Sequence, residues 1–328
     1  MYKRCINCTV SSMRRGSSGK VLSTGSSFET THETMLLSIV SEIDDSTIEH
    51  AYNSRDLMEV YESTGKCNKA VQCARAVFDI LTKESSTPKN DLANAYSDLG
   101  NSLCSAFKPL EALPYLGPAI EFAMLHVAGE PELYKTFNID RFMRNQSRAH
   151  LQLGNFGSAL EDLHKAELCQ AIIHGPDSHY DGETNYERAK IAAWQGDLNE
   201  ALTVGTKAYK LVRDEKPTHP SVSAALYRLG WVYQLVGHHD GALLLLERAL
   251  KICQLNEDHR GNQGESARVK WRISQIYREL GREDEARKLC DEAEETKRVL
   301  LSTGDYAVVE DKDDKDASWD ALVGLLYR

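Results

Sequence analysis

The chain has 328 residues, of which 41% are hydrophobic and 27% charged, a composition typical of a folded protein rather than a disordered one. Its formal net charge of −10 argues against generic binding to nucleic acids or anionic membranes, because both require a cationic protein surface. No run of about 18 apolar residues occurs, so we expect no transmembrane helix, and the eight scattered cysteines are typical of a cytoplasmic protein.

Residues 1–46 are predicted to form a disordered or poorly structured leader. Its first 28 residues hold several lysines and arginines, many serines and glycines, and no acidic residue. Mitochondrial targeting segments have a similar composition. The leader lacks a clean amphipathic period, however, so we expect a cytoplasmic protein and keep a mitochondrial location as the minor alternative.

From residue 47 to residue 301 the sequence repeats one frame at intervals near 42 residues. Each unit is anchored by an alanine, and in five units a glycine stands five residues earlier; the second unit has Phe107 at that place. Glycine suits a left-handed turn after a first helix, and alanine lets a second helix pack closely against it. The frame predicts six antiparallel helix pairs, anchored at Ala70, Ala112, Ala159, Ala201, Ala242 and Ala286.

The frame Leu-Gly-x-x-Tyr, Gly, Ala, Ala resembles the tetratricopeptide repeat, best over 223–256 and clearly over 267–300. The interval resembles the longer repeat of kinesin light chains and related fungal repeat proteins. This resemblance implies an all-α, right-handed superhelical solenoid of about six helix pairs, stacked because no single pair can bury its apolar faces alone. It also implies an inner groove that is lined by the first helix of each pair.

Two further segments follow the array. Residues 302–317 are predicted to be an acidic linker. Residues 318–328 read SWDALVGLLYR, with apolar residues at helical spacing. We predict a short capping helix here, which would cover the exposed end of the last repeat, because terminal repeats need such caps.

No complete catalytic or cofactor motif occurs in the sequence. The densest cluster of potential metal ligands is the stretch HGPDSHYDGE, which holds His174, Asp177, His179, Asp181 and Glu183. Proline and glycine in this stretch favour a solvated loop between repeats over a metal site. We therefore predict no enzymatic activity, no cofactor and no metal.

One stripe of the first helices is basic and aromatic, although the protein as a whole is acidic. It is obtained by following residues at i, i+3, i+7 and i+10 on each first helix. Arginine, tryptophan and tyrosine are the residues that most often anchor interfaces, although packing between repeats and surface ion pairs are alternative roles. The candidate groove residues are Arg141, Asn145, Arg148, Tyr186, Lys190, Tyr227, Trp231, Trp271, Arg272 and Arg278.

The resulting hypothesis is a non-catalytic scaffold that binds a protein or peptide segment, acidic and with an apolar anchor, in its concave groove. Two alternatives stay open. The chain could be the sensor arm of a larger signalling architecture, or an enzyme or accessory protein with a small-metabolite site in the groove. We expect no nucleic-acid partner and no membrane span, and the sequence leaves the oligomeric state open.

Overall fold

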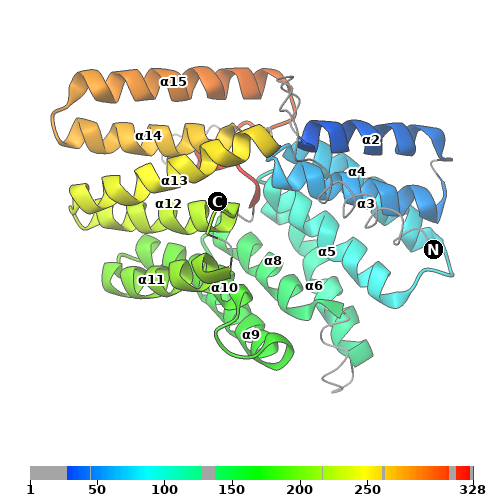
Figure 1. Ribbon diagram of the computed structural model, residues 1–328. Helices are drawn as coiled ribbons and strands as arrows, with labels where there is room; N and C mark the ends of the chain where they lie inside the picture. Colours follow the sequence, from blue (N-terminus) through cyan, green and yellow to red (C-terminus); the bar gives the residue numbers. More distant parts are fainter. Residues whose placement is uncertain are drawn as a thin grey trace, which may run out of the picture.

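The structure, a computed structural model, contains only helices and connecting loops in the part of the chain that it describes (Figure 1). The all-helical prediction is confirmed for this part. None of the described helices is long and apolar enough to cross a membrane. The described residues are 28–44, 46–127, 137–215, 217–260, 263–309, 315–325 and 328.

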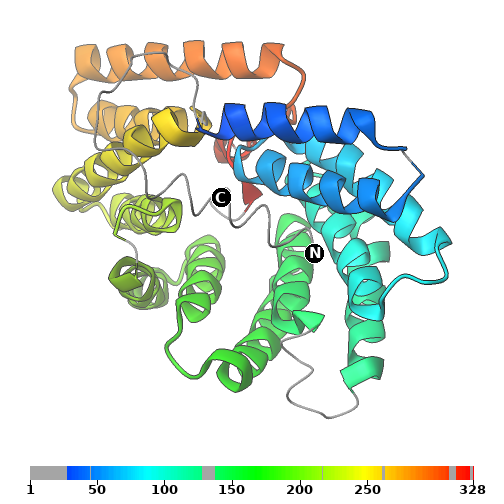
Figure 2. The same cartoon turned by 45° about the vertical axis from the view of Figure 1, so that its right-hand side comes forward.

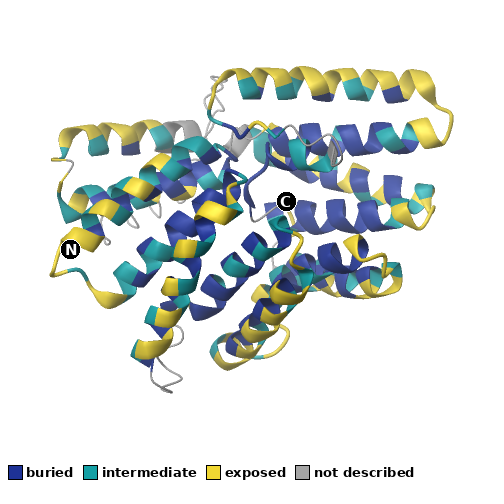
Figure 3. Cartoon of the chain, turned by 180° about the vertical axis from the view of Figure 1, so that it is seen from behind, coloured by how far each residue is buried: buried dark blue, intermediate teal, exposed yellow. Residues whose placement is uncertain are grey.

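Twelve of the helices form six consecutive pairs, and the pairs follow an arc around a central space (Figure 2). The first helix of each pair lies nearer this space, and in every pair but the first most of its residues are buried (Figure 3). The pairs are α3 (Ile48–Ser63) with α4 (Cys67–Lys83), α5 (Lys89–Ser105) with α6 (Pro109–Val127), α8 (Ile139–Gln152) with α9 (Phe156–His174), α10 (His179–Trp194) with α11 (Leu198–Glu215), α12 (Pro220–Leu235) with α13 (His239–Arg260), and α14 (Gly264–Glu279) with α15 (Glu283–Ser302).

The repeated small residues lie where two helices of a pair meet. All six anchoring alanines are completely buried. The five turn glycines have φ between 72° and 82°, which is the left-handed region where glycine has no steric penalty. Phe107 stands at the same place in the second pair and also has a positive φ, of 57°. The turn geometry is thus the same in all six pairs, although one of them lacks the glycine.

The two ends of the array are joined. α2 (Phe28–Glu42) packs against α3 of the first pair and against α13 of the fifth. After α15 the chain crosses to α4, where the side-chain amide of Asn68 donates to the carbonyl oxygens of Gly304 (2.9 Å) and Tyr306 (3.0 Å). The hydroxyl group of Tyr306 in turn donates to the carbonyl oxygen of Thr64 at 3.4 Å.

α2 is a correction to the predicted leader, because residues 28–42 of the expected unstructured stretch are helical. Leu36 explains this helix: its side chain is buried with Met58 and Tyr61 in the core of the first two pairs. Residues 1–27, on which the targeting prediction depends, lie outside the described residues.

The last segment of the chain lies inside the arc and does not cover the end of the sixth pair (Figure 2). It comprises the short helix α16 (Lys315–Asp320), residues 321–325 and Arg328, and we call it the inserted segment. Its apolar side chains Trp319, Leu322 and Val323 belong to a core that residues of the fourth, fifth and sixth pairs form. The predicted cap is therefore corrected: the helical spacing identified a buried segment, but the surface that buries it is the inner face of the array.

Candidate partner-binding groove

The acidic side chains of the inserted segment pair with cations from two repeats, the fourth and the sixth. Asp316 pairs with Arg272 of α14 at 2.6 Å. Asp320 pairs with Arg268 of α14 at 2.8 Å and with Lys190 of α10 at 3.5 Å. Although burial alone would raise the pKa of Asp320, Lys190, Arg268 and Arg228 hold it well below its usual range. Asp320 is therefore ionised at neutral pH and is bound as a carboxylate.

Between these two carboxylates lies an aromatic anchor. Trp319 is stacked on Trp271 of α14, with ring centroids 5.3 Å apart and planes inclined by 22°. The ammonium group of Lys297 lies 4.4 Å from the centroid of the Trp319 ring, and only 2% of Trp319 is exposed. Stacked aromatic pairs contribute about 0.5–1.5 kcal/mol of stabilisation beyond the burial of their surface. Trp319 is therefore the side chain that anchors the inserted segment to α14.

Three glycines allow the backbone of the inserted segment to approach the array closely. A Cβ atom built on Gly264 would lie 2.0 Å from the carbonyl oxygen of Leu322, and one on Gly65 would lie 2.7 Å from the same atom. A Cβ atom on Gly324 would lie 2.5 Å from the carbonyl oxygen of Glu62. Any larger residue at these positions would push the segment away.

Arg328 contacts the second and the fourth pair of the array. Its guanidinium group donates to the carbonyl oxygens of Ser105 (2.7 Å) and Val323 (2.8 Å) and lies over the ring of Phe107. Its own carbonyl oxygen accepts a hydrogen bond of 2.7 Å from the hydroxyl group of Tyr186. The inserted segment thus contacts residues from both halves of the arc.

The arginines of the groove are held in place by tyrosines of the preceding repeats. The guanidinium carbon of Arg268 lies 4.1 Å from the centroid of the Tyr227 ring, and Arg272 donates to the Tyr227 hydroxyl group at 3.3 Å. Arg228 similarly lies over the ring of Tyr186 at 5.2 Å. These side chains are buried and contact one another, so the cations of the groove have a defined orientation while the inserted segment is bound.

Five of the ten predicted groove residues lie at the inserted segment. Lys190, Trp271 and Arg272 contact its side chains, Tyr186 contacts its backbone, and Tyr227 orients the arginines. Arg272 is not a solvated side chain on a groove wall, because only 6% of it is exposed, and the same holds for Arg148 with 4%.

Of the other five predicted residues, four contact neighbouring repeats and Arg278 does not. Arg141 pairs with Asp98 at 3.0 Å, and the amide of Asn145 donates to Ser97 at 3.1 Å. Arg148 pairs with Glu187 at 3.0 Å. The two remaining residues differ in burial, because Trp231 packs against Ala192, Ala193 and Ala201, whereas Arg278 is exposed and bonds only Gln275 of its own helix.

Two groups at this site were missing from the prediction. Arg268 lies on the same helical stripe as Trp271 and Arg272, so that stripe could have identified it. Asp316 and Asp320 belong to a segment that had been interpreted as linker and cap. Their identification required knowing that residues near 190, 270 and 320 meet, which no local pattern contains.

The cluster HGPDSHYDGE has visible structural roles. Ser178 and Asp181 form a capping box at the start of α10, and Glu183 pairs with Arg144 of the preceding repeat. His174 stacks on Tyr180 with ring centroids 4.1 Å apart. Among the residues that the structure describes, no group of three His, Cys, Asp or Glu side chains is arranged to hold a metal ion.

Comparison with known proteins points to one family. Residues 180–254 and 267–299 each match a model of the tetratricopeptide repeat. The comparison with curated proteins finds no match.

Among solved structures, the apo form of RapI is similar with a TM-score of 0.57 and 14% identity, over 83% of this chain and 91% of that one. Aspartyl phosphate phosphatase F from Bacillus subtilis has a TM-score of 0.54 and 14% identity, over 87% and 67%. BtubC (BKLC) from P. vanneervenii has a TM-score of 0.52 and 17% identity, over 78% and 96%. At these identities the likeness shows the fold alone. The repeat matches show that the chain contains tetratricopeptide repeats, at residues 180–254 and 267–299.

Proposed function

We propose that this protein is a non-catalytic interaction module whose concave groove binds a partner segment with carboxylates on either side of an aromatic or other apolar anchor. One observation carries the proposal: the inserted segment presents this arrangement in Asp316, Trp319 and Asp320 and is bound by Arg272, Trp271, Arg268 and Lys190. The described residues of the groove supply cations and an aromatic surface but no group of metal ligands.

A partner that uses the same cations must displace the inserted segment. A tethered segment has an effective concentration in the millimolar range when its linker is short and flexible. An external segment of equal intrinsic affinity therefore binds weakly until the tethered one is released. This competition provides the test of the proposal.

The test uses a fluorescently labelled synthetic peptide with the sequence of residues 315–328 and the full chain carrying Trp319→Ala, which weakens the tethered competitor. We expect the peptide to bind this variant with micromolar affinity and the unchanged chain at least about tenfold more weakly, a difference of about 1.4 kcal/mol. Affinity should fall between low and high salt, because the Asp316 carboxylate that pairs with Arg272 is partly exposed and this pair is screened.

Two further substitutions in the Trp319→Ala chain locate the binding site. Trp271→Ala should weaken peptide binding at least about tenfold, whereas Arg278→Gln should leave it unchanged, because Arg278 is exposed and bonds only Gln275. Circular dichroism checks that each variant is folded, and Asp320→Asn replaces Trp319→Ala if that variant is not. Peptide binding that is indifferent to both salt and Trp271 would refute the proposal.

A further inference from the structure

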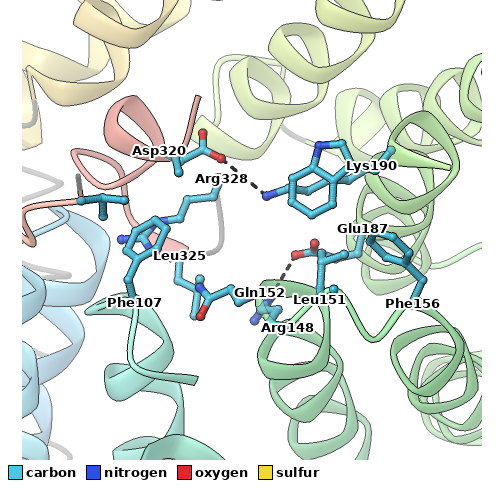
Figure 4. Close-up of a pocket in the computed structure, with 14 residues that line it drawn as sticks. Phe107, Arg148, Leu151, Gln152, Phe156, Glu187, Lys190, Asp320, Leu325 and Arg328 are labelled. Carbon is cyan, nitrogen blue, oxygen red and sulfur yellow. Dashed lines mark hydrogen bonds and ion pairs between the residues drawn. The ribbon is translucent and has the colours of Figure 1, made fainter. Parts of the chain in front are cut away.

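A cavity of about 310 Å³ remains between the inserted segment and the third and fourth repeats (Figure 4). We call it the chamber. One wall is formed by α8 and α10, which contribute Arg148, Gln152 and Lys190, and the opposite wall by Asp320, Leu325 and Arg328 of the inserted segment. The volume lies at the lower end of the range for small-molecule sites in proteins, about 300–1,000 Å³. The chamber exists only while the segment is in place, because the segment is one of its walls.

Among the described side chains that line the chamber, three cations face only two carboxylates, those of Glu187 and Asp320. Of the three cations, Arg148 is paired with Glu187 and Lys190 with Asp320, but Asp320 is shared with Arg268. Arg328 is bound only to carbonyl oxygens, and no carboxylate of the described residues pairs with it. Its nitrogen Nη1 has no hydrogen-bond partner in the described part of the chain, although only 3% of the residue is exposed.

A buried cation without a counterion is unfavourable. Burial accordingly lowers the pKa of both Arg328 and Lys190. An anion in the chamber would offset this cost, because Arg328 and Lys190 both line the chamber and their side chains are buried, which strengthens the attraction between charges. A carboxylate suits an arginine well, since its two oxygens match the guanidinium donors.

The rest of the wall is apolar and aromatic. Phe107, Phe156 and Trp194 line the chamber together with Leu151 and Leu325. Trp194 is 39% exposed, an unusual exposure for so large a ring. The side-chain oxygen of Gln152 is buried without a hydrogen-bond donor among the described residues. The wall therefore offers an apolar surface that an aromatic ring could contact, and one hydrogen-bond acceptor, the side-chain oxygen of Gln152, that has no donor among the described residues.

We propose that the chamber binds a small organic carboxylate with an aromatic body and a hydroxyl or amino group beside the carboxylate. Arg328 and Lys190 bind the carboxylate, the aromatic side chains cover the ring, and Gln152 accepts from the hydroxyl or amino group. Because Arg328 and Leu325 belong to the inserted segment, the ligand binds only when the segment is in place. The ligand therefore stabilises the inserted state.

This site has a consequence for regulation that rests on the proposed function. A ligand that needs the inserted segment and a partner that displaces it must oppose each other, and by linkage each lowers the affinity of the other by the same factor. The small molecule would thus keep the groove closed to partners. The binding of the ligand itself does not depend on any partner.

The first test measures binding of phenyllactate to the full chain by calorimetry and by thermal unfolding, with phenyllactamide as a neutral molecule of the same shape. We expect phenyllactate to bind and to raise the melting temperature, and phenyllactamide to do neither at the same concentration. Equal binding of the two compounds, or no binding of phenyllactate at tens of millimolar, would overturn the proposal. Both results are independent of the labelled-peptide experiment, so the two proposals can fail separately.

Substitutions then locate the ligand. Arg328→Gln should weaken phenyllactate binding at least tenfold, and Arg278→Gln, which changes an exposed arginine outside the chamber, should leave it unchanged. If Arg328→Gln does not fold, Trp194→Ala serves instead, because Trp194 is 39% exposed. Unchanged affinity in the folded chamber variant would contradict the site. If the ligand is bound there, saturating phenyllactate should also weaken binding of the labelled peptide to the unchanged chain.

Discussion

At the scale of single residues, the closest approaches between paired helices occur at glycines. A Cβ atom on Gly230 would lie 2.8 Å from Cγ of Leu246, and one on Gly100 would lie 2.5 Å from the side chain of Leu116. Both glycines lie in the first helix of a pair, opposite a leucine of the second. The pattern Leu-Gly in the sequence frame thus has a physical cause: the glycine makes room for the leucine across the pair.

Gly230→Ala should therefore destabilise the protein by overpacking, by about 1–3 kcal/mol. Gly157→Ala in α9 is the matched control, because a Cβ atom there would meet nothing within 4 Å, and it should be neutral or slightly stabilising. Urea unfolding of both variants measures the difference. Equal stability of the two variants would mean that Gly230 and Leu246 are not packed as described.

A second residue-scale effect concerns pH. Burial raises the pKa of Glu62 to about 7, although its carboxylate accepts hydrogen bonds from Ser102 and Asn101. Because this pKa is higher in the folded than in the unfolded chain, the stabilisation from a protonated Glu62 is complete below about pH 4.5 and is lost as the pH rises through about 7.

Glu62→Gln should remove the loss of folding stability that accompanies ionisation of Glu62 at high pH. The variant should melt at a higher temperature than the unchanged chain at pH 8, and the gap should narrow at pH 5, where Glu62 is protonated. The exposed pair of Glu161 and Lys165 offers a control, since Glu161→Gln should change little at either pH. A gap between Glu62→Gln and the unchanged chain that is the same at both pH values would contradict the assignment.

At the scale of elements, the sequence predicted what is local and missed what is distant. The anchoring alanines and turn glycines act within one helix pair, so their spacing sufficed to place all the pairs. Phe107 was the one departure, and it keeps the left-handed turn while its ring contacts Arg328. The inserted segment was recognised as helical and apolar, but its contacts span large separations: Lys190 and Asp320 are 130 residues apart. The sequence thus predicted the stripe of cations, but it did not predict that Asp316, Trp319 and Asp320 of the same chain are bound there.

The glycines that face the inserted segment give an element-scale prediction. Gly264→Ala would place a Cβ atom 2.0 Å from the carbonyl oxygen of Leu322, so it should expel the segment while the helix pairs remain folded. Trp319 would then lose its burial, and tryptophan emission should shift to longer wavelength with unchanged helical circular dichroism. Gly157→Ala again serves as control. An unshifted spectrum in Gly264→Ala would show that the segment tolerates the added methyl group.

At the scale of the whole molecule, the array differs from an open solenoid because its ends are joined. The side-chain amide of Asn68 is central to this junction, since it donates to the carbonyl oxygens of both Gly304 and Tyr306. The pair of Lys69 and Asp305, at 3.1 Å, lies beside it. The junction is made by the segment that follows the last repeat, and through it the first repeat has a contact on the side where the first repeat of an open solenoid would have none.

Asn68→Ala should cost about 1–3 kcal/mol, because two hydrogen bonds are lost, and it should increase the radius of gyration measured by small-angle scattering as the ends separate. Asn53→Ala is the matched control, because the Asn53 amide bonds only the carbonyl oxygen of Glu49 in its own helix. Unchanged dimensions and stability in Asn68→Ala would mean that other contacts suffice to hold the junction.

The junction also sets the order of events during folding. Helix pairs form from contacts between near neighbours in the chain and can appear quickly, but Asn68 and Tyr306 are 238 residues apart. Closing so long a stretch of chain lowers its conformational entropy, and this cost precedes any stabilisation from the contact. The helix pairs should therefore form early and the junction last, so that the chain passes through an open, fully helical intermediate before it reaches the closed form.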